Sequence, residues 1–161
     1  MSLQELHSYQ DPTMTTNTPE PFLDKLEQVA PRLEGGLMSE AEEFCLNSRY
    51  AFLKIVENWD KKGENGQSAE VNRKMWLQRY YTAMTAGRDL LADFRPRVEE
   101  RDYFNLIWRN CGYRWEWGRL LLVTDNLDLV LGKIDSVFGN LQTLAKQEDA
   151  DLAQMKAPLA V

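Results

Sequence analysis

Apolar side chains recur at alternating steps of three and four residues over several long stretches of the chain. This spacing constrains the fold more than any other feature, because residues three or four apart lie on one side of an α-helix. The most regular stripe consists of Leu77, Tyr80, Met84, Gly87, Leu91 and Phe94. A glycine within such a stripe lets another backbone or ring come close. We therefore expect a second helix to pass near Gly87.

Five helices follow from the stripes and from the turn residues between them. They are predicted at residues 20–33, 40–60, 69–94, 97–123 and 126–148. The apolar pattern slips by one position between Leu122 and Leu127, which favours a turn at 124–126. The alternative is one bent helix over 97–148. Alternating β-branched runs are absent, so we expect an all-α helical bundle, antiparallel because the connections are short.

Chain length and polarity suggest the domain organisation. The chain has 161 residues, which suits a single domain. We expect a polar tail at 1–19, a helical-bundle domain at 20–148 and a second tail at 149–161. Because no apolar run approaches the roughly 20 residues of a membrane span, we expect no membrane contact. The first residues lack a signal-peptide pattern, so we expect a cytoplasmic protein.

Catalytic and metal chemistry has few candidate residues. The two cysteines, Cys45 and Cys111, fall in separate helical stretches, and the only histidine is His7. Zinc sites, di-iron bundles and His-dependent nucleophiles all need more ligands or bases than this. We expect two buried, reduced thiols, and we predict no catalytic residue, no cofactor and no metal site.

Two acidic pairs form the one motif that suggests an enzyme. Glu40-x-x-Glu43 is followed by Glu57-x-x-Asp60. This spacing resembles the paired carboxylates of the MazG-like, all-α nucleotide pyrophosphatases. The resemblance covers these four residues and implies a magnesium ion held against nucleotide phosphates. Carboxylate oxygens are the ligands that this hard ion prefers.

The position of the acidic pairs on the predicted helices argues against shared metal binding. Residues 44–56 contain no turn signal and are expected to continue one helix. At 1.5 Å of rise per residue, Glu43 and Glu57 would then lie about 21 Å apart on one rod. A nucleotide pyrophosphatase therefore stays a remote alternative.

Positive charge is concentrated in the middle of the chain. Residues 73–119 hold 10 basic and 6 acidic side chains, whereas residues 1–72 hold 6 basic and 13 acidic ones. Spaced arginines are suited to phosphate binding. The candidate nucleic-acid contacts are Arg73, Lys74, Arg88, Arg95, Arg97 and Arg101. The alternative is that these cations pair with nearby acids on the surface, and the net charge of −6 disfavours free-standing nucleic-acid binding.

The stretch 97–123 is apolar around most of its circumference, so we expect it to be the most buried helix. Its main stripe includes Trp108 and Trp115, which we assign to the core. Tyr113 and Trp117 lie off this stripe. Together with Arg114 they are our candidate protein interface, because Trp, Tyr and Arg are enriched at binding hot spots.

The sequence therefore favours a non-enzymatic helical interaction protein, acting as an adapter, an assembly factor or a small subunit of a larger complex. Its partner would be another protein or a second copy of the same chain. The alternative is a helical subunit that contacts nucleic acid within a ribonucleoprotein, through residues 73–119.

Overall fold

The computed structural model describes residues 18–156, and every regular element in that range is a helix. The predicted all-α class is thus confirmed. The α-helices are α2 (Glu20–Arg32), α3 (Met38–Glu57), α4 (Ala69–Ala92), α5 (Arg101–Thr124), α6 (Leu127–Phe138) and α7 (Leu141–Lys156). Short 3₁₀ turns occupy Leu33–Gly35, Glu64–Gly66 and Val98–Glu100. The rest of the predicted tails, at 1–17 and 157–161, lies outside the described residues.

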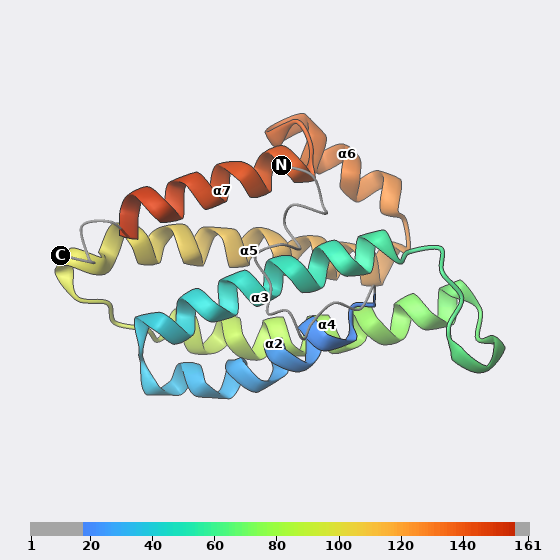
Figure 1. Ribbon diagram of the computed structural model, residues 1–161, viewed down its shortest axis with the longest axis horizontal. Coiled ribbons are helices and arrows are strands. Elements are labelled where there is room, and N and C mark those ends of the chain that lie inside the picture. The colour runs from blue at the N-terminus through green and yellow to red at the C-terminus, as the bar shows by residue number, and fades with distance from the viewer. Residues whose placement is uncertain (1–17, 157–161) are drawn as a thin grey trace.

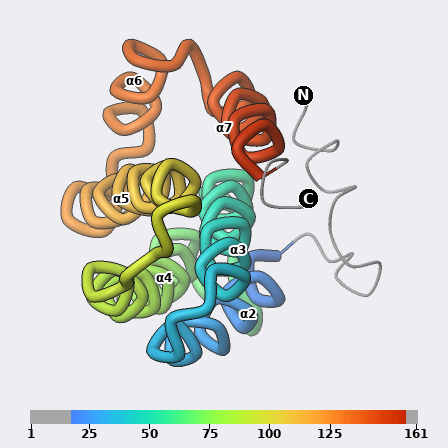
Figure 2. Tube along the Cα trace, turned by 90° about the vertical axis from the view of Figure 1, so that its left-hand side faces the viewer, coloured from blue at the N-terminus to red at the C-terminus, as the bar shows by residue number. Residues whose placement is uncertain are grey.

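Helices α2 to α5 lie side by side and form the core bundle (Figure 1). Helices α6 and α7 form an arm on the side of the bundle where α3 and α5 lie, across from α2 and α4 (Figure 2). Helix α5 contacts α3 and α4 within the bundle and both helices of the arm. It is therefore the one bundle helix that packs against both helices of the arm, while α3 reaches α7 through ion pairs.

The predicted apolar stripes account for the packing of α2, α3 and α4. All six residues of the α4 stripe, from Leu77 to Phe94, are buried. The close approach expected at Gly87 is also confirmed, since a Cβ added there would lie 2.1 Å from the Phe44 ring of α3. A second close approach brings the Tyr80 ring to Gly118 of α5, where an added Cβ would lie 2.5 Å from it. These contacts hold α4 tightly against both neighbours.

The prediction that residues 97–123 form the most buried helix is wrong, because α3 is buried more completely. Its buried side chains run from Ala41 to Ile55 and include Arg49 and Lys54. Helix α3 packs against α2, α4 and α5, and its Arg49 also reaches α7. In α5, by contrast, Trp108 and Trp115 are only half-buried, so their assignment to the core needs correction.

The predicted helix over 126–148 is two helices. Gly139 ends α6 with φ of 90°, a conformation that favours glycine, and the Asn140 side chain accepts a hydrogen bond from the Thr143 N–H at 2.8 Å. Helix α7 then continues to Lys156, so residues 149–156 are helical instead of tail, and Leu152 is buried.

The turn predicted between α5 and α6 is present, and the alternative of one bent helix is wrong. Asp125 adopts a left-handed conformation with φ of 51° directly after α5. Asn126 then caps α6 by accepting a hydrogen bond from the Leu129 N–H at 3.0 Å.

Within residues 18–156, no helix combines the length and the apolar composition needed to cross a bilayer.

Candidate protein interface

An aromatic cluster joins α5 to the arm at the position where the sequence predicts an interface. The rings of Tyr113 and Trp117 stack with their centres 5.7 Å apart, and Phe138 of α6 packs edge-on against both, at 5.3 and 6.1 Å. Trp117 is buried and also contacts Phe52 of α3, whereas Tyr113 is half-buried. Within this chain, the two predicted interface aromatics thus hold α6 against the bundle.

A hollow of about 330 Å³ lies beside this cluster, between α5 and α6. Its lining residues are Tyr113, Glu116, Trp117, Leu120, Lys133, Ser136, Val137 and Phe138. The apolar wall is formed by the aromatic cluster and by Val137, while Glu116 and Lys133 supply one charge of each sign. The predicted residues Tyr113 and Trp117 therefore line a concave surface as well as joining two helices.

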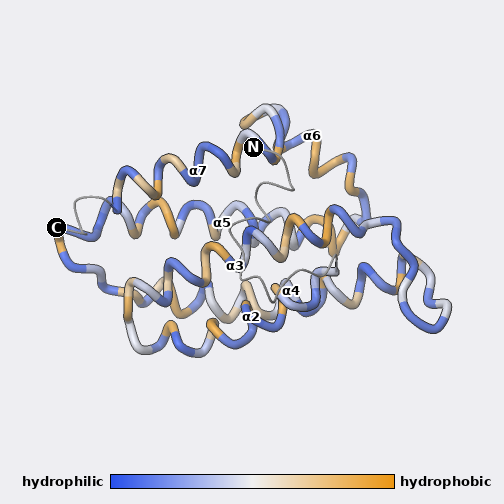
Figure 3. Tube along the Cα trace, in the orientation of Figure 1, coloured by the Kyte–Doolittle hydropathy of each residue, from blue (hydrophilic) through white to orange (hydrophobic). Residues whose placement is uncertain are grey.

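Helix α6 carries unusual apolar exposure for its length. Only Val130 and Ile134 of its residues are buried, although much of the helix is hydrophobic (Figure 3). Leu129 is 43% exposed and Val137 is 70% exposed. The two are eight residues apart on the solvent side of the helix, and the exposed Lys133 lies four residues from each, between them. We call Leu129 and Val137 the α6 face.

Arg114, the third predicted interface residue, is buried between α5 and α7. Its guanidinium pairs with the buried carboxylate of Glu148 on α7 and donates a hydrogen bond to the Asn110 carbonyl at 3.3 Å. The Tyr80 hydroxyl in turn donates to the Arg114 carbonyl at 3.2 Å. Burial works to lower the pKa of Arg114, but the charge and hydrogen bond of Glu148, together with Cys45 and Tyr80, outweigh it and the pKa is raised. Arg114 therefore remains a cation inside the protein.

Arg49 of α3 adds a second buried cation to this contact. It pairs with Asp149 and lies 3.9 Å from the Glu148 carboxylate, so that two arginines of the bundle face two acids of α7. We call these four residues, Arg49, Arg114, Glu148 and Asp149, the buried charge cluster. Sequence reasoning missed it, although Arg49 lies between Cys45 and Phe52 on the buried side of α3.

The two cysteines meet in the interior beside this cluster. Cys45 and Cys111 are both buried, free thiols, as predicted, and they share a hydrogen bond. That hydrogen bond and burial raise the pKa of Cys111 well above its usual range. The sequence pattern alone gives no sign of this contact, because 66 residues separate the two cysteines. The contact between α3 and α5 brings them together.

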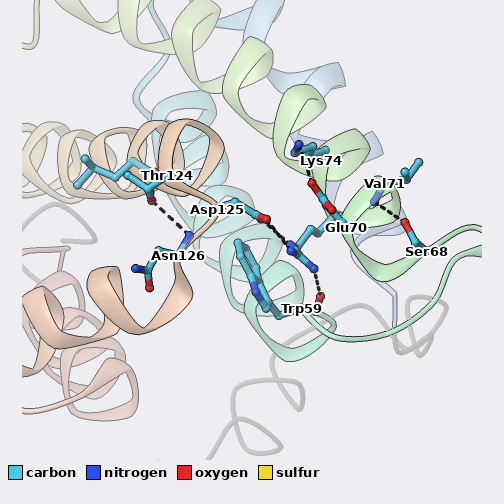
Figure 4. Close-up of polar contacts among 10 residues, drawn as sticks. Trp59, Ser68, Glu70, Val71, Lys74, Thr124, Asp125 and Asn126 are labelled. Carbon is cyan, nitrogen blue, oxygen red and sulfur yellow. Dashed lines mark hydrogen bonds and ion pairs between the residues drawn. The ribbon is translucent and has the colours of Figure 1, made fainter.

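The candidate nucleic-acid residues do not gather at one place, and most have intramolecular partners. Arg73 binds both carboxylate oxygens of Asp125 at 2.6 Å and lies over the Trp59 ring (Figure 4). Lys74 pairs with Glu70 in the same view, at 3.0 Å. Beyond the end of α4, Arg97 pairs with Glu100 at 3.1 Å.

The remaining candidates lack such carboxylate partners among residues 18–156. Arg95 donates to the carbonyls of Ala92 and Phe94, at 3.4 and 3.1 Å. Arg88 stacks on Trp115, with its guanidinium carbon 4.1 Å from the ring centre. Arg101, at the start of α5, is exposed. Within the described residues, the predicted strip therefore divides equally into three cations that hold carboxylates and three that do not.

Three of the four acids that resemble the pyrophosphatase motif, Glu40, Glu43 and Glu57, form ion pairs within the chain. Glu40 and Glu43 face Arg32, at 3.4 and 3.1 Å, and Glu57 pairs with Lys54. Glu43 and Glu57 belong to the one helix α3, as expected. In the part of the chain that the structure describes, no three His, Cys, Asp or Glu side chains are grouped so that they could hold a metal ion.

Comparison with known proteins adds no relative. No protein family, curated protein or solved structure matches this chain.

Proposed function

We propose that this chain is a non-enzymatic helical interaction protein whose α6 face receives an apolar helix of a partner protein. Such a protein would serve as an adapter, an assembly factor or a small subunit of a larger complex. The proposal keeps two expectations from the sequence, namely a cytoplasmic location and antiparallel packing of neighbouring helices.

The observation that carries the proposal is the uncovered α6 face beside the hollow at Tyr113 and Trp117. Leu129 and Val137 lie one turn on either side of the exposed Lys133 along this side of α6. A partner helix laid along this face could bury both apolar side chains. Exposed apolar surface of this kind, with polar residues at its edge, is typical of interaction sites.

The adjoining hollow favours an apolar side chain as its occupant. Its lining includes the rings of Tyr113, Trp117 and Phe138, and its charged members, Glu116 and Lys133, carry one charge of each sign. An interface with an apolar centre and a polar rim has this composition. We therefore expect the partner helix to insert a large apolar residue next to Tyr113.

The test compares two valines of equal exposure. Val137 on α6 is 70% exposed, and Val98, in the turn before α5, is 71% exposed. Val137→Lys should abolish binding of the partner, whereas Val98→Lys should leave it unchanged. Both variants should stay folded, since surface substitutions typically change stability by about 0.5 kcal/mol or less.

The measurement has two parts. Light scattering on the purified chain shows whether the partner is a second copy. Quantitative co-purification, with crosslinks mapped from position 137, identifies a different partner and the segment that touches α6. The proposal requires that a partner protein or a dimer is lost in Val137→Lys and retained in Val98→Lys. The crosslinks from position 137 should fall on an apolar helix of that partner. A monomer whose co-purifying proteins are the same in both variants would contradict it.

The alternatives have weaker support. Contact with nucleic acid would have to use the candidate arginines, but two of them, Arg73 and Arg97, already pair with carboxylates of this chain. Nucleotide hydrolysis would need Glu43 and Glu57 to cooperate from distant turns of one helix. Neither alternative explains the exposed apolar side chains of α6.

A further inference from the structure

A second surface, between α4 and α5, is built around the half-buried ring of Trp115. Arg88 and Tyr81 reach it from α4, and Arg119 lies one turn further along α5. The two guanidinium carbons lie 4.1 and 5.9 Å from the ring centre, and the Tyr81 ring stacks at 6.0 Å. Residues 115 and 117 point to different sides of a helix, so this surface is separate from the α6 face.

The Trp115 ring is fixed in place. Its indole N–H donates a hydrogen bond to the Thr85 hydroxyl at 3.0 Å. A fixed ring restrains the guanidiniums that stack on it, because a cation over an aromatic face is held by the electrostatics of that face. Arg88 and Arg119 are thus partly ordered before any partner arrives, which lowers the entropy cost of binding.

Both arginines lack a carboxylate partner within residues 18–156. This separates them from the arginines that tie helices together: Arg32, Arg49, Arg73, Arg79 and Arg114 each pair with an acid of another element. Stacking on a ring leaves the N–H edge of a guanidinium free to donate. Two such edges near one ring suit two carboxylates, which arginine binds through paired hydrogen bonds.

The crowding of Trp115 indicates which anion fits. A nucleobase would need an open aromatic face, but Arg88, Tyr81 and Arg119 already surround this ring. Carboxylates need no such face, because they bind in the plane of the guanidinium. We propose that Arg88, Trp115 and Arg119 form a docking site for an acidic segment of a partner protein. This proposal does not rest on the α6 face.

The test is a fluorescence-anisotropy titration at low salt with three labelled probes: an oligoglutamate peptide, an oligoglutamine peptide of equal length, and an oligothymidine. The intact chain should bind oligoglutamate and not oligoglutamine. The double variant Arg88→Gln/Arg119→Gln should weaken oligoglutamate binding by about tenfold or more, since it removes the charge-assisted hydrogen bonds that both guanidiniums would donate to carboxylates. The matched control, Lys74→Gln/Arg97→Gln, removes the same charge from cations that already hold carboxylates and should change binding less than about twofold.

Three results would overturn the proposal. One is no binding of oligoglutamate, and another is equal weakening by both double variants, which would indicate only a general effect of charge. The third is tighter binding of oligothymidine with the same dependence on Arg88 and Arg119, which would assign the site to nucleic acid. If the glutamine variant fails to fold, Arg88→Lys/Arg119→Lys keeps the charge but removes the planar fork. It should still weaken oligoglutamate binding several-fold.

Discussion

The core bundle and the arm are attached by different physical interactions. In the bundle, complete apolar stripes on α2, α3 and α4 interlock, and rings of one helix press against glycines of the next. The arm buries two side chains of α6, and α7 adds three buried apolar side chains, Leu144, Ala145 and Leu152, to the ion pairs that Arg49 and Arg114 form with its acids. Apolar burial is non-directional and strong, whereas buried ion pairs contribute little net stability but fix one arrangement. We therefore expect the arm to open more readily than the bundle unfolds.

The largest effect is expected from a change in the bundle. Phe44 is fully buried and its ring rests on Gly87. Phe44→Ala should lower the free energy of unfolding by about 3–5 kcal/mol, the usual loss for a buried aromatic ring. Urea denaturation should show this loss, and hydrogen exchange should speed up throughout α3 and α4. Faster exchange confined to the arm would refute the view that this contact supports the whole bundle.

The second prediction concerns the buried charge cluster. Glu148→Leu should leave the Arg114 charge buried without its partner, at a cost of about 3 kcal/mol. Hydrogen exchange should show that α7 loses protection while α4 keeps it. The double variant Arg114→Met/Glu148→Leu should recover most of the loss, because apolar side chains of similar volume can replace a buried ion pair. If the double variant is no better than the single one, the pairing is not what holds α7.

The junction within the arm should give a smaller effect. Gly139 has φ of 90°, so Gly139→Ala should cost about 1–3 kcal/mol in local stability. Gly132 provides a control in the same helix, since it is helical and open around its Cβ position. Gly132→Ala should raise stability by up to about 1 kcal/mol. Hydrogen-exchange rates at the α6–α7 junction measure the effect of each substitution on local stability. Similar effects of Gly139→Ala and Gly132→Ala would contradict a helix break at Gly139.

The smallest effect is expected at the ion pair that ties the arm's first turn to α4. Asp125→Asn keeps a residue that tolerates the left-handed conformation but removes the carboxylate bound by Arg73. The loss should be below about 1 kcal/mol, because the pair is partly exposed.

This pair also predicts a dependence on pH. The hydrogen bond from Arg73 lowers the pKa of Asp125 below its ordinary value of 3.8. The folded carboxyl binds protons more weakly than the unfolded one, so its contribution is complete above that value and is lost as the pH falls through the folded pKa. Thermal denaturation of the wild type and of Asp125→Asn should therefore converge in acid. A constant difference down to pH 2 would contradict this assignment.

The sequence predicted the bundle well because its stripes are local and regular. The six stripe residues that begin at Leu77 and end at Phe94 are all buried, as are Phe22, Leu26, Val29 and Leu33 before them. In these helices one face is plainly apolar, and the position of each side chain follows from the helical repeat alone. The break at Gly139 was harder to predict, because a glycine inside a helical pattern is often tolerated. The following Asn140 was the signal for a new helix start.

The candidate site could be predicted only in part. Helix α5 is apolar nearly all round, so its pattern does not indicate which face the arm covers. As a result, Trp117 is buried while Trp115 is half-exposed, the reverse of what the stripe suggested. Arg114 reads as a surface residue until Glu148, 34 positions later, is placed beside it. Such contacts depend on tertiary packing, which no local periodicity encodes.

Because Cys45 and Cys111 meet in the interior, the rate at which they react with a thiol reagent measures how often the protein opens. Thiols react as thiolates, and these two are buried, while the pKa of Cys111 is also raised. A thiol reagent can reach them only when the helices that cover them separate. Because the chain contains no other cysteine, the labelling rate of the unmodified protein reports that opening directly. Binding of a partner that closes or releases the arm could then be followed in time without any engineered probe.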